Sequence, residues 1–537
     1  MVVIGEKPRV LVVEDEILED YLWNLRSGDA YELIGASTLD EALKKLEEDT
    51  FDVVVVDLML PDSIEQGLRV ISRVKTLDQA IAIIVVTGHP EPGMASRIIH
   101  RVGASDFLYK PLDFADCRRK IYRAIEDHRY RLMAIDAAEH GGFAPIHNPY
   151  VAGSPLGAGN VMFYGQDEIF DFICTNIGKS HNYNHLALIG PNRIGKTSIL
   201  QQLSQRLPPS EFVPVNVNCQ AFGIDLGMPA FFSQLMTQIK HCLRLQKLDT
   251  STMPIVHTFE WHFLTFMESF LPNVYKILDG RSLILCLDEF EELANKVRRK
   301  RLDVSVFDFL YNLMTQEQIV FVLAGTRRLM TLGRLYHAAA NIVESTISRE
   351  VTTLSPDATR RLIEERVAYS GMHYQEAAIE LIKEVTGGYP YLVQLLCGLL
   401  VNLRNERKKN EITVDDVQDA ISAVIETSQP GFFWESLTSY QKIVLLAVTQ
   451  LWRHQEVLTT SRVEGEVLYM GVNLLAWPPT VQVADILREL CFDGLLREVI
   501  DIRKGPTYTL AFELSGKWIT RHRKNLEQVL REKYGNN

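Results

Sequence analysis

Five residues in the first part of the sequence have the types and order needed for phosphoryl chemistry. Glu14, Asp15 and Asp57 stand at the carboxyl ends of short apolar runs, Thr87 closes a further run, and Lys110 follows another. A carboxylate accepts a phosphoryl group most readily where Mg²⁺ neutralises the crowded oxygens and a fixed cation meets the new charge. Such a site needs several acids, a lysine and a hydroxyl, and this set supplies each of them. We therefore expect Asp57 to accept a phosphoryl group.

The elements that must position these residues follow from the periodicity of residues 1–127. Short β-branched runs alternate there with amphipathic stretches, which is typical of a parallel βαβ sheet. Five such units predict a flavodoxin-like doubly wound fold, in which the carboxyl ends of the strands converge on one crevice. The predicted strands cover residues 9–13, 32–36, 53–57, 81–87 and 107–109, and the predicted helices cover residues 17–26, 39–48, 66–74, 95–102 and 114–128.

A second group of residues matches the phosphate-binding pattern G-x-x-x-x-G-K-[ST] directly after an apolar run at 185–189. In this pattern the glycines let backbone N–H groups wrap the phosphates, and the following helix presents its N-terminus to the negative charge. Lys196 is expected to reach the β and γ oxygens, and Thr197 is expected to bind Mg²⁺. The nine residues are Gly190, Pro191, Asn192, Arg193, Ile194, Gly195, Lys196, Thr197 and Ser198.

Two acids at the end of another apolar run supply what a P-loop alone lacks. The run at 282–288 ends in Asp288, and Glu289 follows it. Asp288 is expected to hold Mg²⁺ through water, and Glu289 is expected to polarise the attacking water. A glutamate in this position favours hydrolysis over binding alone. The two groups together predict an ATPase that uses ATP and Mg²⁺.

The composition excludes several other classes of protein. The chain has 537 residues, 47% of them hydrophobic and 23% charged, with a net charge of −12. These values are ordinary for a soluble globular protein of several domains. No apolar stretch approaches the length of a membrane span, and the N-terminus has no signal-peptide pattern. We expect a cytoplasmic protein without a membrane partner.

The first group of residues closely resembles the receiver family of two-component signalling. The segments 57–61 and 103–111 match the family's segments nearly residue for residue, Gly67 matches the glycine of the loop after the acceptor, and Phe107 occupies the position of the switch aromatic. The resemblance implies that Glu14, Asp15 and Asp57 hold Mg²⁺ and that Thr87 and Lys110 contact the phosphoryl oxygens. It also implies that a sensor histidine kinase is the phosphodonor.

Residues 160–428 resemble the STAND-like branch of the AAA+ ATPases. The segment 163–168 is similar to one that lies beside adenine in that family, although Gln166 replaces its arginine. The segment 320–327 looks like the sensor strand, which implies that Thr326 or Arg327 lies near the γ-phosphate. Pro390 belongs to a segment similar to the one whose proline packs near the nucleotide in the helical lid. The resemblance further implies an ATP-dependent homo-oligomer.

The C-terminal part resembles a winged helix, with helices followed by a hairpin at 496–502 and 507–512 that turns at 504–506. A winged helix that reads DNA needs a basic helix for the phosphates. Residues 436–537 carry 13 Lys and Arg against 11 Asp and Glu, and the helix at 481–493 has Arg488 as its one basic residue beside three acids. The charge therefore favours protein partners or self-assembly, and DNA binding is possible but not favoured.

The sequence thus predicts an α/β protein in five parts. They are a receiver domain at 1–127, a linker at 128–160, a P-loop ATPase core at 161–355, a helical lid at 356–428 and a winged-helix domain at 436–524. We interpret the chain as a phosphorylation-controlled response regulator with an ATP-hydrolysing switch as its output. Two alternatives stay open: an ATP-gated transcriptional regulator that binds DNA, and a scaffold that binds ATP with negligible turnover.

Overall fold

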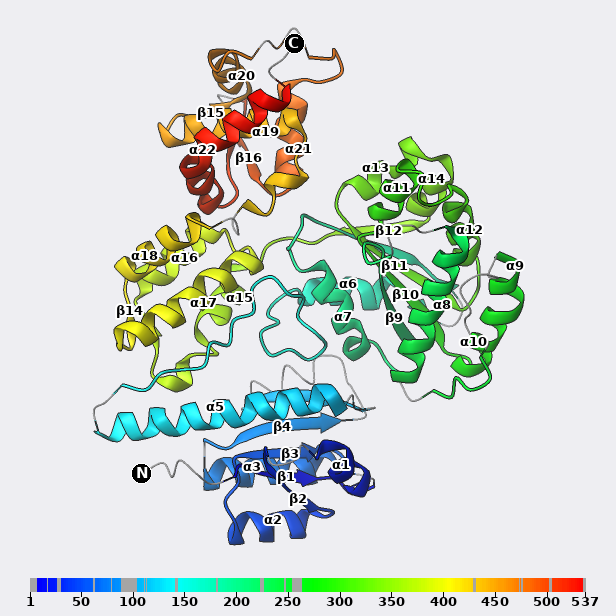
Figure 1. Cartoon of the computed structure of the whole chain (residues 1–537), viewed down its shortest axis with the longest axis vertical. Coiled ribbons are helices and arrows are strands. Elements are labelled where there is room, and N and C mark those ends of the chain that lie inside the picture. Colours follow the sequence, from blue (N-terminus) through cyan, green and yellow to red (C-terminus); the bar gives the residue numbers. More distant parts are fainter. Residues whose placement is uncertain are drawn as a thin grey trace.

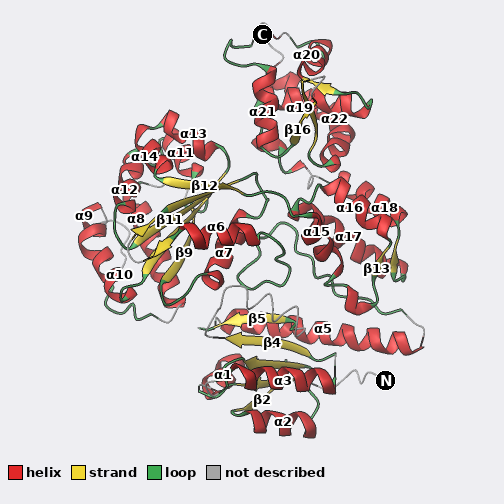
Figure 2. Cartoon of the chain, turned by 180° about the vertical axis from the view of Figure 1, so that it is seen from behind, coloured by secondary structure: helices red, strands yellow, loops and turns green. Residues whose placement is uncertain are grey.

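The structure is a computed structural model of the whole chain, shown in Figures 1 and 2. It describes residues 7–16, 18–26, 30–60, 63–78, 80–87, 104–110, 112, 114–140, 143–179, 182–222, 227–245, 248–253, 263–427, 431–472, 474, 477–501 and 505–534.

The first part of the chain forms a five-stranded parallel sheet in the order β2-β1-β3-β4-β5. Every residue of β3 and β4 is buried, because helices cover both faces of the sheet and give it two separate apolar cores. The predicted doubly wound α/β fold is confirmed, and the helix predicted at 95–102 lies outside the described residues. The strands are β1 Arg9–Val13, β2 Glu32–Ala36, β3 Val53–Asp57, β4 Ala82–Thr87 and β5 Asp106–Tyr109, and the helices are α1 Leu18–Leu25, α2 Leu39–Glu48, α3 Ile64–Leu77 and α5 Phe114–His140.

The helix that closes this part is longer than the sequence predicted. A helix end at residue 128 was wrong, since α5 continues to His140 and so enters the span expected to be a linker. No glycine or proline interrupts the sequence before Gly141, and residues 129–140 are mostly good helix formers. Figures 1 and 2 show α5 and the edge strand β5 on the side of the receiver domain that faces the rest of the chain.

A second parallel sheet has the order β12-β8-β11-β10-β9. Its strand β12 was missed in the sequence because the segment ends in Ser-Arg-Glu and lies exposed at the sheet edge, without the apolar run of a buried strand. The strands are β8 His185–Ile189, β9 Phe212–Asn218, β10 Ser282–Asp288, β11 Ile319–Gly325 and β12 Thr346–Glu350.

Helices cover both faces of the second sheet. One face packs on α8 and α10 to α14 and forms an aromatic-rich core. The other face packs on α6 and α7 and shares its core with the helices that follow in the chain. The helices are α6 Asp167–Asn176, α7 Lys196–Arg206, α8 Met228–Leu245, α9 Phe263–Thr265 with a π-helical turn at Phe266–Phe270, α10 Leu271–Leu278, α11 Glu291–Arg298, α12 Ser305–Met314, α13 Arg328–Leu335 and α14 His337–Glu344, and a short hairpin joins β6 Gly178–Lys179 to β7 Asn182–Tyr183.

A helical subdomain follows the second sheet. The last helix of this subdomain begins with a capping box: the Thr413 side chain accepts a hydrogen bond from the Asp416 N–H, and the Asp416 side chain accepts one from the Thr413 N–H. Two strands of two residues each, β13 and β14, pair in parallel between its helices. The elements are α15 Pro356–Glu364, a 3₁₀ turn at Ala368–Ser370, β13 His373–Tyr374, α16 Glu376–Thr386, α17 Pro390–Arg407, β14 Glu411–Ile412 and α18 Val414–Ile425.

The C-terminal module combines helices with a three-stranded antiparallel sheet in the order β15-β17-β16. The predicted hairpin is present, but a turn at 504–506 was wrong, since Gly505 and Pro506 already pair with β16. Pro506 is tolerated there because β15 pairs only with Thr507 and Tyr508 of β17, so Pro506 has a neighbouring strand on one side alone. The elements are a 3₁₀ turn at Trp434–Ser436, α19 Ser439–Arg453, β15 Leu458–Thr459, α20 Thr460–Tyr469, α21 Val483–Phe492, β16 Leu496–Asp501, β17 Gly505–Leu510 and α22 Glu513–Tyr534.

Residues 143–162, which we name the strap, connect α5 to the second sheet. Although this segment was predicted to be a linker, it is extended and tied down: buried Arg404 donates to the Ala144 carbonyl, and the Tyr150 hydroxyl donates to the Ile363 carbonyl. In the described part of the chain, no helix combines the length and apolar character needed to cross a bilayer.

Candidate phosphoryl-acceptor and nucleotide sites

The receiver sheet brings its acidic residues together at the carboxyl ends of its strands. Glu14 follows β1 and Asp57 ends β3, and both are almost fully buried, while Asp15 is half-buried. Carboxylate oxygens of Glu14, Asp15 and Asp57 lie within 4.8 Å of one another. Oxygen ligands at this spacing suit a hard divalent cation such as Mg²⁺.

Lys110 reaches into this acidic cluster from the end of β5. Its Nζ lies 2.5 Å from Asp57 Oδ2 and 2.9 Å from Glu14 Oε2. Burial alone would lower the pKa of the Lys110 ammonium, but its hydrogen bonds to the two carboxylates outweigh burial and raise that pKa. Burial raises the pKa of Glu14 despite the lysine. Lys110 therefore stays charged beside the candidate acceptor.

The backbone completes the arrangement around Asp57. The Met59 N–H donates to Asp57 Oδ1 at 3.0 Å, and the Lys110 N–H donates to the carbonyl of Thr87 at 2.8 Å. Thr87 is buried at the end of β4, directly beside β3. All five residues expected from the sequence therefore gather at one edge of the sheet.

One residue beside this cluster was missed in the sequence. Tyr21, buried on α1, has its ring centroid 6.0 Å from Lys110 Nζ and packs edge-on against Phe114. Burial, with the nearby charges of Glu14 and Asp57, raises the pKa of its hydroxyl. Its position on the apolar face of α1 was the available signal, and that signal predicts only core packing.

The phosphate-binding loop joins β8 to α7 in the expected place. Gly195 precedes α7 with φ +114°, a conformation that favours glycine, and a Cβ on Gly190 would lie 2.8 Å from the Val351 carbonyl oxygen. Lys196 Nζ donates to the carbonyls of Gly190 at 2.9 Å and Pro191 at 3.0 Å. The loop is thus curled with its lysine held across it.

The acids of β10 lie against this loop. The Thr197 hydroxyl donates to Asp288 Oδ2 at 2.5 Å, so the two expected magnesium ligands are in direct contact. Glu289 has φ +51°, an unusual conformation for a glutamate that is held where its side chain faces the cavity. Burial raises the pKa of Glu289 to about 7, with Lys196 opposing the rise and the carboxylates of Glu291 and Asp288 adding to it.

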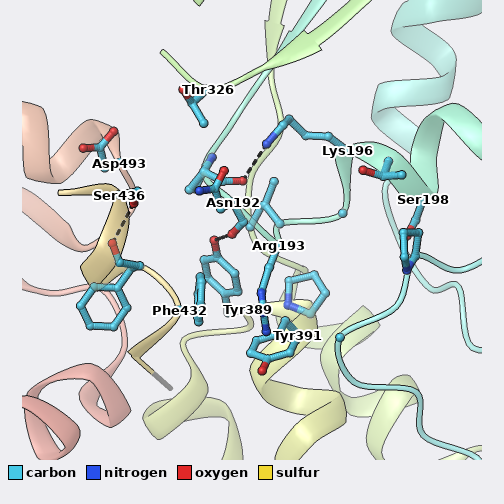
Figure 3. Close-up of a pocket in the computed structure, with 18 of the residues that line it drawn as sticks. Asn192, Arg193, Lys196, Ser198, Thr326, Tyr389, Tyr391, Phe432, Ser436 and Asp493 are labelled. Atoms are coloured by element: carbon cyan, nitrogen blue, oxygen red, sulfur yellow. Dashed lines mark hydrogen bonds between the residues drawn. The ribbon is translucent and has the colours of Figure 1, made fainter. Parts of the chain in front are cut away.

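A cavity of about 1100 Å³ opens beside the loop, and four parts of the chain line it. The strap, the second sheet, the helical subdomain and the C-terminal module each contribute a wall. Figure 3 shows Ser436 and Asp493 on the opposite side of the P-loop residues from Ser198. The predicted residues Thr326, Arg327 and Pro390 all line this cavity, as do residues of the P-loop and Glu289.

Aromatic residues beyond the second sheet hold the P-loop in place, and the sequence did not predict them. The Tyr389 hydroxyl donates to the carbonyl of Asn192, and the Arg193 guanidinium lies 4.4 Å from the Tyr391 ring centroid and 5.4 Å from that of Phe432 (Figure 3). Single aromatic residues scattered through helical segments give no sequence pattern that points to such a contact.

Further hydrogen bonds position the residues around Thr326 on the sensor side of the cavity. Buried Glu291 accepts a hydrogen bond from the Thr326 N–H at 2.7 Å, and Arg328 donates to the Ser436 carbonyl at 2.6 Å. The Gln166 side chain donates to the Thr352 carbonyl at 3.0 Å, so it ties the segment after β12 to the start of α6. Neither Glu291 nor Arg328 was singled out in the sequence, because each adjoins a residue with a stronger pattern.

The C-terminal module closes the cavity from the far side. A Cβ on Gly494 would lie 2.9 Å from Pro191 Cγ, so the module touches the P-loop itself. Gln441 donates to the carboxylates of Glu489 at 3.1 Å and Asp493 at 3.3 Å. Burial raises the pKa of Asp493 to about 6, with Arg328 opposing and Glu489 adding to the rise.

Comparison with known proteins decides the identity of the first part. Residues 10–122 match the family model of the response regulator receiver domain. The chain therefore carries a response regulator receiver domain, followed by a region with the fold of a P-loop ATPase. For the receiver, the match agrees with the five-stranded parallel sheet and its acidic crevice.

Curated relatives are similar over part of their length. The transcriptional regulatory protein ZraR of Escherichia coli is 26% identical over 219 residues, which are 40% of this chain and 45% of the relative. The alkaline phosphatase synthesis transcriptional regulatory protein PhoP of Bacillus subtilis is 35% identical over 107 residues, 19% of this chain and 42% of the relative. The chain thus spans less than half the length of these two relatives.

A solved structure supports the fold of the remainder. The ORC2 protein of Aeropyrum pernix matches with a TM-score of 0.50 and 14% sequence identity. The match covers 74% of this chain and 100% of the ORC2 chain. At this identity the likeness concerns the fold alone.

The acidic crevice predicts that Asp57 is the acceptor. Acetyl phosphate with Mg²⁺ should label the wild type and leave Asp57→Asn unlabelled, because that substitution removes the nucleophilic carboxylate oxygen. Asp40→Asn, at an exposed position of α2, is the control and should be labelled like the wild type. Undiminished labelling of Asp57→Asn would show that the acceptor lies elsewhere.

The contacts of Lys110 predict a different effect from its removal. Lys110→Ala should still be labelled, because the three carboxylates keep the metal, but labelling should no longer change the conformation of the receiver. Proteolysis with and without acetyl phosphate measures this: the wild-type cleavage pattern should shift and the variant's should not. Loss of labelling in Lys110→Ala would contradict this division of roles.

The raised pKa of Glu289 predicts how ATP hydrolysis depends on pH. A general base must be deprotonated, so the rate should rise with pH, level off above about 7 and fall about tenfold per pH unit well below it. Steady-state turnover between pH 5.5 and 9 at saturating ATP tests this. A rate that stays flat from pH 5.5 to 7 would exclude Glu289 as the base.

Proposed function

We propose that this protein is a phosphorylation-controlled response regulator whose output is an ATP-binding and ATP-hydrolysing switch. A sensor histidine kinase would phosphorylate Asp57, and the ATPase-like region would change its nucleotide state or self-association in response. The observation that carries the ATPase part is the contact of Thr197 with Asp288, where Thr197, Lys196 and Glu289 line a large cavity.

The residues of this wall fit Mg²⁺ and a triphosphate. A hydroxyl and a carboxylate oxygen already in contact are the donor set that Mg²⁺ takes together with phosphate oxygens. When bound, Mg²⁺ would supply charge neutralisation between the β- and γ-phosphates. Lys196 would exchange its two carbonyl acceptors for phosphate oxygens, and Glu289 would take the proton of the attacking water. Thr326 or Arg327 would lie near the γ-phosphate on the sensor side.

The cavity also fits the rest of an ATP molecule. Its volume of about 1100 Å³ lies just above the usual range for ligand sites, and apolar residues including Met162 and Leu362 line part of it. Pro390, at the first turn of α17, lines the same region. We propose that the helical subdomain is the lid of a STAND-like AAA+ ATPase and that the base lies between lid and strap.

We propose that the C-terminal module is a winged helix that acts on protein partners or on another copy of the chain. Arg488, the basic residue of α21, is paired with Asp485 at 2.6 Å, and the hairpin bears exposed Val499 and Ile500. A DNA-reading helix would present unpaired cations, whereas exposed aliphatic residues suit a protein contact.

The second candidate is an ATP-gated transcriptional regulator that binds DNA through this module. The names of ZraR and PhoP, both transcriptional regulatory proteins, favour it. A gel shift on protein carrying beryllofluoride and ATP separates the candidates. Submicromolar, sequence-dependent binding near physiological salt would favour the transcriptional regulator. Weak binding that is independent of the DNA sequence would favour protein partners.

The nucleotide site predicts opposite effects for two substitutions. Lys196→Ala should abolish ATP binding, because its charge holds the phosphates in the ground state, whereas Glu289→Gln should bind ATP and lose hydrolysis at least about a hundredfold. Calorimetric titration and phosphate release measure the two quantities, with the exposed Glu317→Gln as control. Equal turnover in wild type and Glu289→Gln would favour a tight-binding scaffold.

The switch itself predicts a change of size. Glu289→Gln saturated with ATP and beryllofluoride should have a larger mass by light scattering than the same protein with ADP and no beryllofluoride. The matched control is the double variant Lys196→Ala/Glu289→Gln, which should stay at the smaller mass. One unchanged mass in all conditions would contradict self-assembly as the output.

A further inference from the structure

The strap is bound to the lid by a row of polar side chains on α17. Gln394 Oε1 accepts from the Val151 N–H at 2.9 Å, and Asn405 both accepts from the Ile146 N–H and donates to its carbonyl, at 3.0 and 2.8 Å. Between them, the Asn148 side chain donates to the Gly398 carbonyl at 2.8 Å. Positions three and four apart share one helix face, so α17 holds the strap along its length.

The strap then runs along α7, the helix that begins with the P-loop lysine. The Leu156 N–H donates to the Ser198 hydroxyl at 3.0 Å. Gln202 accepts from the Gly159 N–H at 3.0 Å and donates to the Gly157 carbonyl at 2.7 Å. Gln202 is 4% exposed, and a buried polar side chain is costly unless it is hydrogen-bonded. Its partners are all in the strap.

The end of the strap lies on the receiver domain. Gly159 has φ +69°, and a Cβ there would lie 3.3 Å from the carbonyl oxygen of Phe107 in β5. Val161 packs against both the receiver core and the core shared by the ATPase-like region and the lid. The same strand β5 leads in three residues to Lys110, whose ammonium contacts Asp57.

The middle of the strap also forms part of the nucleotide cavity. Ser154, Pro155 and Leu156 line it beside Ser198 of the P-loop. A shift of β5 that moved Gly159 would therefore reach the cavity wall within a few residues, as long as Gln202 kept the strap on α7.

We propose that Gln202 is a positioning residue through which the receiver domain and the nucleotide site control one another. Gln202 fixes residues 156–159 on α7, so the strap has one defined position between β5 and the P-loop. Phosphorylation at Asp57 changes that position, and nucleotide in the cavity favours one position over the other. The inference rests on the proposed nucleotide site and names its regulation.

Such coupling is reciprocal, since two ligands that bias one element change each other's affinity by the same factor. Beryllofluoride at Asp57 should therefore change the affinity of the cavity for nucleotide, and nucleotide should change the affinity for beryllofluoride equally. A residue that only stabilises the fold would shift both nucleotide affinities together and leave their ratio unchanged.

The experiment uses the full chain and the fluorescent nucleotide mant-ADP with Mg²⁺. The quantity measured is the ratio of the dissociation constants with and without beryllofluoride. The wild-type ratio should differ from one by at least about fivefold, the lower end of typical couplings. Gln202→Met, which keeps the length of the side chain and removes its hydrogen bonds, should bring the ratio close to one. Gln201→Met is the control, because the Gln201 side chain makes no hydrogen bond among the described residues.

Each outcome decides between coupling and binding. A wild-type ratio retained in Gln202→Met would overturn the role of Gln202, and a wild-type ratio of one with normal mant-ADP binding would overturn the coupling while leaving the nucleotide site in place. Absence of mant-ADP binding in the wild type would reject the proposed function and this inference with it. Should Gln202→Met fail to fold, Val161→Ala tests the other end of the strap, with the same expected loss of the ratio.

Discussion

Parallel pairing of strands is the constraint on which both candidate sites depend. In a parallel sheet every strand ends at the same edge, so side chains that are far apart in the sequence meet there without any further contact to bring them together. The receiver uses this edge to gather Glu14, Asp57 and Lys110. The second sheet uses it to bring Thr197, after β8, against Asp288, at the end of β10. The charged groups that meet at each edge are shielded from water, and the lower dielectric there strengthens the interaction between them.

This constraint also explains what the sequence could predict. Residues at strand ends were identified because an apolar run followed by an acid or a glycine is visible in one segment at a time, and the α/β class follows from the same runs. The exposed strand β12 was not predicted because it has no apolar run. The full length of α5 was not predicted because no sequence feature at residue 128 shows whether the helix ends or continues there. Contacts made across the cavity, such as Tyr389 with Asn192, depend on tertiary packing that no local pattern records.

The segment predicted to be a linker shows the same limit. Its glycines and prolines indicate a chain without regular structure, and this is correct for residues 143–160. Composition does not reveal that Gln202 and Asn405 provide partners for its backbone groups. Buried backbone groups need hydrogen bonds, and an irregular segment obtains them from side chains.

The sharing of one apolar core has a consequence for how the molecule unfolds. The core on the α7 side of the second sheet continues without a break through the lid into the C-terminal module, whereas the receiver has two cores of its own. We therefore expect the three later parts to melt as one cooperative unit and the receiver to melt as another. Any ligand of the cavity stabilises the whole larger unit by mass action, including Val499 and Ile500 of the hairpin, which do not line the cavity. Protection from proteolysis at Val499 and Ile500 would thus report occupancy of a cavity that neither residue lines.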